Sequence, residues 1–139
     1  MSFEGGVLVD REALARFRAE LGPGFGRILG YFREDGVKSL GAIEEAMRTR
    51  SAAALVLPAH TLKGEARQFG ANPLAALAEQ IEDHARACVE RHDTPEAALE
   101  DVVALRPLFE STLAVLERDV VPTAAPRRPM PGGFGRRVG

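Results

Sequence analysis

The hydrophobic and polar residues of this chain alternate with the period of an α-helix. In the clearest segment, about residues 51–69, the apolar positions are separated by alternating steps of four and three: Leu55, Ala59, Leu62, Ala66 and Phe69. Such steps place side chains on one face of a helix. Similar stripes cover about residues 10–21, 25–48, 73–91 and 94–118. The pattern therefore predicts an all-α fold built from amphipathic helices.

Helix-capping and helix-breaking residues mark the ends of these segments. Asp10 predicts the first N-cap, and Gly22-Pro23-Gly24 predicts the end of that helix. In Gly70-Ala71-Asn72-Pro73, the glycine ends one helix, the asparagine can cap the next, and the proline suits the first helical position. Thr94-Pro95-Glu96 predicts the start of the last helix.

Three residues predict irregularities inside the helices. Pro58 lacks an amide hydrogen, so the third long segment should kink there or begin its regular hydrogen bonding only afterwards. Pro107 should bend the last helix. Gly36 allows a break or kink in the second.

Four long helices joined by short connections predict an antiparallel up-and-down four-helix bundle, with an additional short N-terminal helix capping one end. A length of 139 residues with 45% hydrophobic content suits a single core. We expect the bundle domain to span residues 1–119. Residues 120–139 are rich in Pro, Gly and Arg and have almost nothing to bury, which predicts a disordered tail.

Charge and composition narrow the choice of partners. Residues 120–139 hold four arginines and no acid, so residues 1–119 keep 14 of the 18 basic side chains and all 20 acids, a charge near −6. An acidic body disfavours nucleic acid and favours a protein partner. The single cysteine cannot form an internal disulfide, and neither an export signal nor a long apolar run is present. We expect a cytoplasmic monomer that does not enter a membrane.

The helix over residues 51–69 carries the candidate chemistry on its polar side. At 100° per residue, His60 lies about 140° from the centre of the apolar stripe and is predicted to face solvent. Lys63, Gly64 and Arg67 fall on the same outward side. Glycine inside a helix costs about 1 kcal/mol relative to alanine, so we infer that something approaches closely at Gly64.

A carboxylate on the next helix is predicted to contact this histidine. With the hairpin turn centred near residue 71 or 72, position 60 is mirrored by position 82 or 83, and Glu82 flanks the buried stripe. Glu82 could accept the Nδ1 proton of His60 and leave Nε2 unprotonated as a nucleophile.

Each candidate residue also has a simpler interpretation. His60 and Lys63 could be ordinary surface residues, Gly64 could serve close helix packing, and Glu82 could be a solvated flank. For Arg67, covering the helix surface is slightly favoured over hydrogen bonding to a partner's acidic rim. The other two histidines, His84 and His92, lack companions at metal-ligand spacing, so no metal site and no cofactor are predicted for the chain itself.

The segment AHTLKGEARQFGA, residues 59–71, resembles the signature of histidine phosphotransfer (HPt) domains. The resemblance covers roughly residues 10–119 and implies a four-helix bundle. It implies that His60 is the phosphoacceptor, that Lys63 lies beside the phosphoryl group and that Gly64 permits receiver-domain docking. Glu82 occupies the position where the family often has Gln or Glu bonded to the histidine.

Two residues depart from the family pattern. Glu65 stands where a small residue is usual, and Pro58 stands where a helix former is common. Glu65 adds negative charge near the expected docking surface, which affects partner specificity more than the reaction.

We therefore predict a carrier that shuttles a phosphoryl group on His60 between receiver-domain aspartates of a two-component phosphorelay. Its partners would be response regulator receiver domains and a hybrid or separate histidine kinase. The receiver would supply Mg²⁺ and most catalytic groups, so the chain is not predicted to be an autonomous enzyme. One alternative is a non-phosphorylated helical module that binds and sequesters a receiver domain or kinase. Another is a helical cofactor that speeds receiver dephosphorylation.

Overall fold

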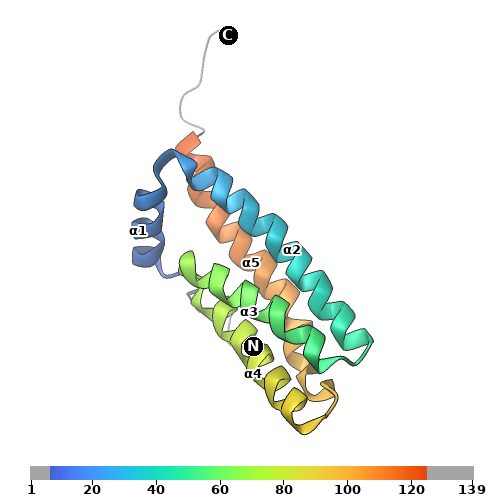
Figure 1. Ribbon diagram of the computed structural model, residues 1–139. Coiled ribbons are helices and arrows are strands. Elements are labelled where there is room, and N and C mark those ends of the chain that lie inside the picture. The colour runs from blue at the N-terminus through green and yellow to red at the C-terminus, as the bar shows by residue number, and fades with distance from the viewer. Residues whose placement is uncertain (1–6, 125–139) are drawn as a thin grey trace.

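The computed structural model describes residues 7–124, and every regular element within them is helical. The elements follow one another in this order: α1 (Arg11–Leu21), the short 3₁₀ helix η1 (Gly22–Gly24), α2 (Phe25–Arg48), α3 (Ala52–Gln68), α4 (Asn72–Arg91), the 3₁₀ helix η2 (Glu96–Ala98) and α5 (Leu99–Ala124). Figure 1 shows the four long helices side by side in one bundle. The predicted all-α fold class is confirmed.

The bundle is closed by contacts between helices that follow each other in the chain and by contacts between the first and last of them. Helix α3 packs against α2 and α4, and α5 packs against α2 and α4. Figure 1 shows α1 outside this set, beside the end of α3. The amide of Asp10 donates to the carbonyl of Gly70 at 2.8 Å, which ties the start of α1 to the α3–α4 turn. The short first helix therefore caps one end of the bundle, as predicted.

Phe69 anchors the core at this end. Its ring lies 5.1 Å from that of Phe17, 6.0 Å from that of Phe25 and 4.9 Å from that of Phe32, between ring centroids. These distances are typical of favourable aromatic pairs. Because Phe69 immediately follows α3, its burial holds the end of that helix against α1 and α2.

The structure rules out a break at Gly36 and a late helix start after Pro58, while a kink at either residue stays a prediction. Helix α2 continues through Gly36 without a break, because Gly36 serves packing: a Cβ there would overlap the ring of Phe109. Helix α3 begins at Ala52, before Pro58, because Ser51 caps it by accepting from the Ala54 amide at 3.1 Å. The alternative in which regular helix starts after Pro58 is therefore wrong, while a bend at Pro107 stays a prediction.

Some helix boundaries also differ from expectation. Asp10 caps α1 as predicted, accepting from the amides of Glu12 and Ala13. The prediction that Asn72 caps α4 is wrong: Asn72 is already helical, and Ala71 is the N-cap without a side-chain hydrogen bond. Backbone pairing explains the difference, since the Asn72 amide donates to the carbonyl of Gly70 at 2.9 Å.

The last helix starts later and ends later than predicted. Residues 96–98 form η2, because the Ala98 amide donates to the Pro95 carbonyl at 2.9 Å, and α5 begins only at Leu99. Helix α5 then runs to Ala124, so residues 120–124 of the predicted tail are helical. Each added residue of a helix gains a backbone hydrogen bond without needing burial. The rest of the predicted tail, residues 125–139, lies outside the described residues, and the domain limits stay a prediction.

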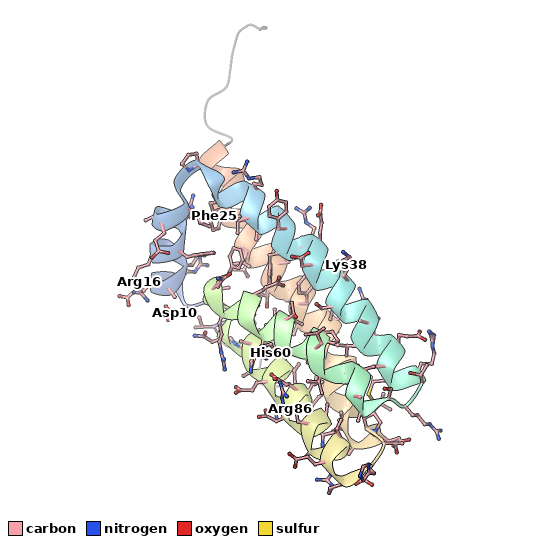
Figure 2. The ribbon with its side chains drawn as sticks, in the orientation of Figure 1. Asp10, Arg16, Phe25, Lys38, His60 and Arg86 are labelled. Atoms are coloured by element: carbon pink, nitrogen blue, oxygen red, sulfur yellow. The ribbon has the colours of Figure 1, made fainter. Side chains whose placement is uncertain are left out.

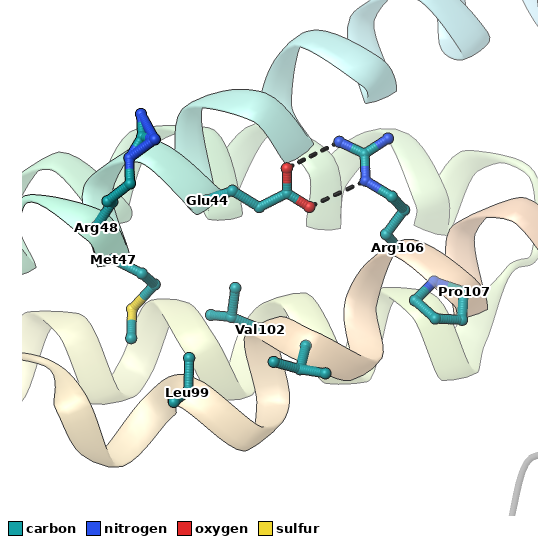
Figure 3. A pocket seen from close by; sticks show the side chains of 8 residues that line it. Glu44, Met47, Arg48, Leu99, Val102, Arg106 and Pro107 are labelled. Carbon is teal, nitrogen blue, oxygen red and sulfur yellow. Dashed lines mark hydrogen bonds and ion pairs between the residues drawn. The ribbon is translucent and has the colours of Figure 1, made fainter.

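Between α2 and α5 runs a surface groove that contains none of the candidate residues. Its walls are Met47, Leu99, Val102, Val103 and Pro107, with charged groups at the edge. Figure 3 shows the Glu44 carboxylate and the Arg106 guanidinium joined across it by two hydrogen bonds of 2.9 Å. No lining residue comes from α3 or α4.

Among the described helices, none combines the length and apolar character needed to cross a bilayer.

Candidate functional site

The inward stripe of α3 determines which way His60 points. Leu55, Ala59, Leu62 and Ala66 are all 0% exposed. The His60 side chain, on the other side of the same helix, is 55% exposed. The prediction that this imidazole faces solvent is therefore confirmed.

Glu82 of α4 lies directly against the imidazole. Its Oε2 atom is 3.0 Å from Nδ1 of His60. The Glu82 side chain is only 3% exposed, so the interpretation of Glu82 as a solvated flank is wrong. The antiparallel α3–α4 hairpin brings together these two residues, which are 22 positions apart in the chain.

Lys63 also contacts this carboxylate rather than standing in solvent. Its Nζ lies 2.7 Å from Glu82 Oε1, and its side chain is 14% exposed. At this distance the contact is a close ion pair between the amine and the carboxylate. The predicted outward position is therefore wrong for the Lys63 amine, because its long stem lets the charge turn inward toward the carboxylate.

Arg86 is part of the same network, and sequence reasoning missed it. Its Nε and Nη2 donate to Glu82 Oε2 at 3.0 and 2.7 Å. Figure 2 shows Arg86 beside His60 on the surface of the α3–α4 pair. The available signal was the spacing, because residues 82 and 86 are one helical turn apart. His60, Lys63, Glu82 and Arg86 form what we call the Glu82 network.

The network keeps Glu82 ionised. Burial alone raises the pKa of this carboxyl, but the contacts with Lys63, Arg86 and His60 outweigh it and bring the pKa from 4.5 to about 2. A carboxylate only accepts hydrogen bonds, so Nδ1 of His60 must be the donor. In the neutral imidazole, Nε2 is then unprotonated and carries the available lone pair.

Gly64 leaves the surface beyond His60 bare. It is exposed, and a Cβ built on it would meet nothing within 4 Å. Close helix packing therefore does not explain this glycine. One turn before the histidine, Leu57 is 71% exposed. Leu57, His60 and Gly64 form an open strip along α3, which we call the α3 strip.

Arg67 lies farther along α3 and is paired with another helix. Its Nη2 is 2.9 Å from Oε1 of Glu79 on α4, and both side chains are substantially exposed. This ion pair covers the helix surface, which is the interpretation that the sequence slightly favoured. It does not belong to the Glu82 network.

Glu65, which departs from the family pattern, faces α2. Burial is the largest cause, and together with the charge and hydrogen bond of the nearby Asp35 carboxyl it raises the pKa of Glu65 from 4.5 to about 7. One of its carboxyl oxygens, Oε1, is buried without a hydrogen-bond partner. Near neutral pH a large fraction of Glu65 is therefore protonated, and the expected extra negative charge is reduced.

The fold and the site together define a class of protein: a helical bundle that presents one solvent-facing imidazole held by a buried carboxylate. Residues 27–118 match the Hpt domain family, and the chain belongs to this family of histidine phosphotransfer domains. This confirms the family that the motif around His60 predicted.

A solved structure has the same fold. The chain is similar to the crystal structure of histidine-containing phosphotransfer protein B (HptB) from Pseudomonas aeruginosa PAO1, with a TM-score of 0.71 and 21% sequence identity. The match covers 81% of this chain and 93% of that chain. No curated protein matches the sequence.

Proposed function

We propose that this protein accepts a phosphoryl group on Nε2 of His60 from the aspartyl phosphate of one receiver domain and passes it to another. The observation that carries the proposal is the 3.0 Å contact between Nδ1 of His60 and the buried carboxylate of Glu82. That contact orients the ring, sets its tautomer and leaves Nε2 unprotonated on a side chain that is 55% exposed.

The transfer step balances without a further reagent. The Nε2 lone pair attacks the phosphorus, the bond between phosphorus and the aspartate oxygen breaks, and its electron pair returns to the receiver's carboxylate. The imidazole ring then carries a positive charge, because Nδ1 keeps its proton. Glu82 stabilises that charge, and the reverse sequence delivers the phosphoryl group to the next aspartate.

The α3 strip would form the docking surface. A receiver domain must bring the phosphorus of its aspartyl phosphate to about 3–3.5 Å from Nε2, and the missing side chain at Gly64 lets its surface approach. On this proposal the receiver supplies Mg²⁺, and the chain is a monomeric cytoplasmic carrier that also serves a hybrid or separate histidine kinase.

Transfer from a receiver domain tests the proposal. We expect a receiver carrying radioactive aspartyl phosphate to label the protein with acid-labile phosphate, and His60→Gln to abolish that label. His84→Gln is the matched control, because His84 lies on α4 outside the Glu82 network, and it should label normally. Absence of label on the wild-type protein, or label that survives His60→Gln, would contradict the proposal.

The same experiment separates the two alternatives. A sequestering module would bind the receiver and leave its aspartyl phosphate intact, without label. A dephosphorylation cofactor would release inorganic phosphate faster than the receiver alone, again without label.

A further inference from the structure

In the unphosphorylated protein, the Glu82 network has more positive charge than is needed to neutralise the Glu82 carboxylate. It contains one carboxylate, two cations and a histidine, so with a neutral imidazole its net charge is +1. Transfer to His60 adds a phosphoryl dianion and leaves a positive ring, which brings the sum to zero. The excess cation is thus matched to the phosphorylated state.

The two cations are not equivalent. The Lys63 side chain is 14% exposed, and its Nζ lies 2.7 Å from Oε1 of Glu82. Lys63 therefore pairs with the carboxylate oxygen that does not contact the imidazole. Arg86 is 55% exposed, as is His60. Its Nε and Nη2 contact Oε2, the same oxygen that contacts the imidazole.

The guanidinium also has donors to spare. Arginine has five N–H donors in a planar fork, and Glu82 accepts from only two of its nitrogens, leaving Nη1 with no hydrogen bond to the described side chains. A guanidinium fork is suited to phosphate oxygens. Rotation of the exposed end of Arg86 would direct these donors toward a group on His60 while Lys63 continues to balance Glu82.

We infer that Arg86, and not Lys63, is the side chain that binds the phosphoryl group on His60, with Lys63 acting as the permanent counter-ion of Glu82. This inference rests on the proposed function. It differs from what the sequence motif implies, which places Lys63 beside the phosphoryl group.

The lifetime of phosphohistidine tests the inference without any receiver. The full chain is phosphorylated with phosphoramidate, a small donor that requires no docking surface, and hydrolysis of the product is followed by phosphorus NMR. Arg86→Gln should shorten the lifetime by about tenfold, the effect of losing one charge-assisted hydrogen bond. Arg86→Lys should restore part of the loss, because it keeps the charge without the fork.

Arg67→Gln is the matched control. Arg67 belongs to the same pair of helices, is 52% exposed and is paired with Glu79, outside the Glu82 network. It should leave the lifetime unchanged. Equal lifetimes for Arg86→Gln and Arg67→Gln would overturn the inference.

A double-mutant cycle distinguishes direct binding from an effect through Glu82. In a Glu82→Gln background, Arg86 no longer pairs with a carboxylate. If Arg86 binds the phosphoryl group, adding Arg86→Gln still shortens the lifetime. If it only positions Glu82, the second substitution has no effect and the inference is wrong.

Lys63→Gln supplies the contrasting result. It should weaken folding more than Arg86→Gln does, because the Lys63 amine that it removes is the more buried of the two partners of Glu82, 14% against 55% exposed, but it should shorten the lifetime less. The opposite ranking of lifetimes would assign phosphoryl binding to Lys63. Failure of the wild-type chain to accept phosphate on His60 would instead reject the proposed function.

Discussion

The backbone of Gly36 on α2 lies directly against the ring of Phe109 on α5. A Cβ at position 36 would overlap two atoms of that ring, and both residues are buried. Phe109 also packs against Phe32, with 5.6 Å between ring centroids. Glycine at this position therefore allows α2 and α5 to approach each other.

Gly36→Ala should destabilise the bundle by about 1–3 kcal/mol, the usual cost of overpacking a core. Urea unfolding followed by circular dichroism measures the change. Gly41→Ala on the same helix is the control, since a Cβ there meets nothing within 4 Å. It should raise the free energy of unfolding by up to about 1 kcal/mol, the gain of alanine over glycine. A neutral Gly36→Ala would contradict the close α2–α5 contact.

Gly64 should show opposite effects on stability and on docking. Gly64→Ala is expected to stabilise the isolated protein by up to about 1 kcal/mol, because the position is helical and open. Gly64→Gln should leave the fold intact but block transfer from a receiver, because its side chain projects from the α3 strip. Phosphoramidate labelling of Gly64→Gln should remain normal, since that donor needs no docking. Unchanged receiver transfer in Gly64→Gln would exclude close approach at this position.

Glu82 should contribute to stability in a defined range of pH. Its pKa is lowered from 4.5 to about 2 in the folded protein, so its contribution is fully present above pH 4.5 and is lost as the pH falls through 2. Glu82→Ala should cost about 3 kcal/mol near neutral pH, because it leaves the largely buried Lys63 amine without its partner.

Glu82→Gln is the milder variant. Its carbonyl can still accept the Nδ1 proton of His60, but the negative charge is absent. Urea unfolding between pH 2 and pH 4.5 should show less loss of stability in this variant than in the wild-type protein. Identical pH profiles would show that Glu82 is not held ionised by the network.

Glu65 should have the opposite pH dependence. Its pKa is raised from 4.5 to about 7, so the folded state binds this proton more tightly than the unfolded chain. The stabilisation is present below pH 4.5 and is lost as the pH rises through 7.

Glu65→Gln removes the ionisable group and with it this pH-dependent loss of stability. At a pH about one unit above the pKa of Glu65, the variant should be more stable than the wild-type protein by about 2 kcal/mol, a figure reduced to allow for the partial exposure of the Glu65 side chain. Unfolding curves across this range measure the effect. Glu79→Gln, an exposed carboxyl paired with Arg67, should leave the pH profile as it is. A wild-type profile in Glu65→Gln would mean that Asp35 and Glu65 do not share a desolvated site.

Much of the site could be predicted from the sequence because it depends on positions within one helix. The apolar stripe of α3 determines which face is buried, and His60 and Gly64 lie on the other face whatever the remaining helices do. The contact between Glu82 and His60 could be predicted with one further assumption, a tight hairpin, because such a turn places the two helices antiparallel and sets which residues face each other.

The rest depended on side chains reaching across space. Lys63 was expected on the outward side of its helix, but its amine turns inward to Glu82. Arg86 was not expected in the site, because its contact depends on the burial of the Glu82 carboxylate, which the sequence did not show. Gly36 suggested a break in α2 until its neighbour was known to be Phe109.

The sequence by itself determined the all-α class, the helical hairpin and the exposed histidine, since helical periodicity acts through neighbours in the chain. The tertiary structure decided which charges pair with Glu82, why Gly36 is a glycine and which protonation state Glu65 prefers. These properties depend on burial and on distances between residues far apart in the chain, and such distances exist only once the helices have packed.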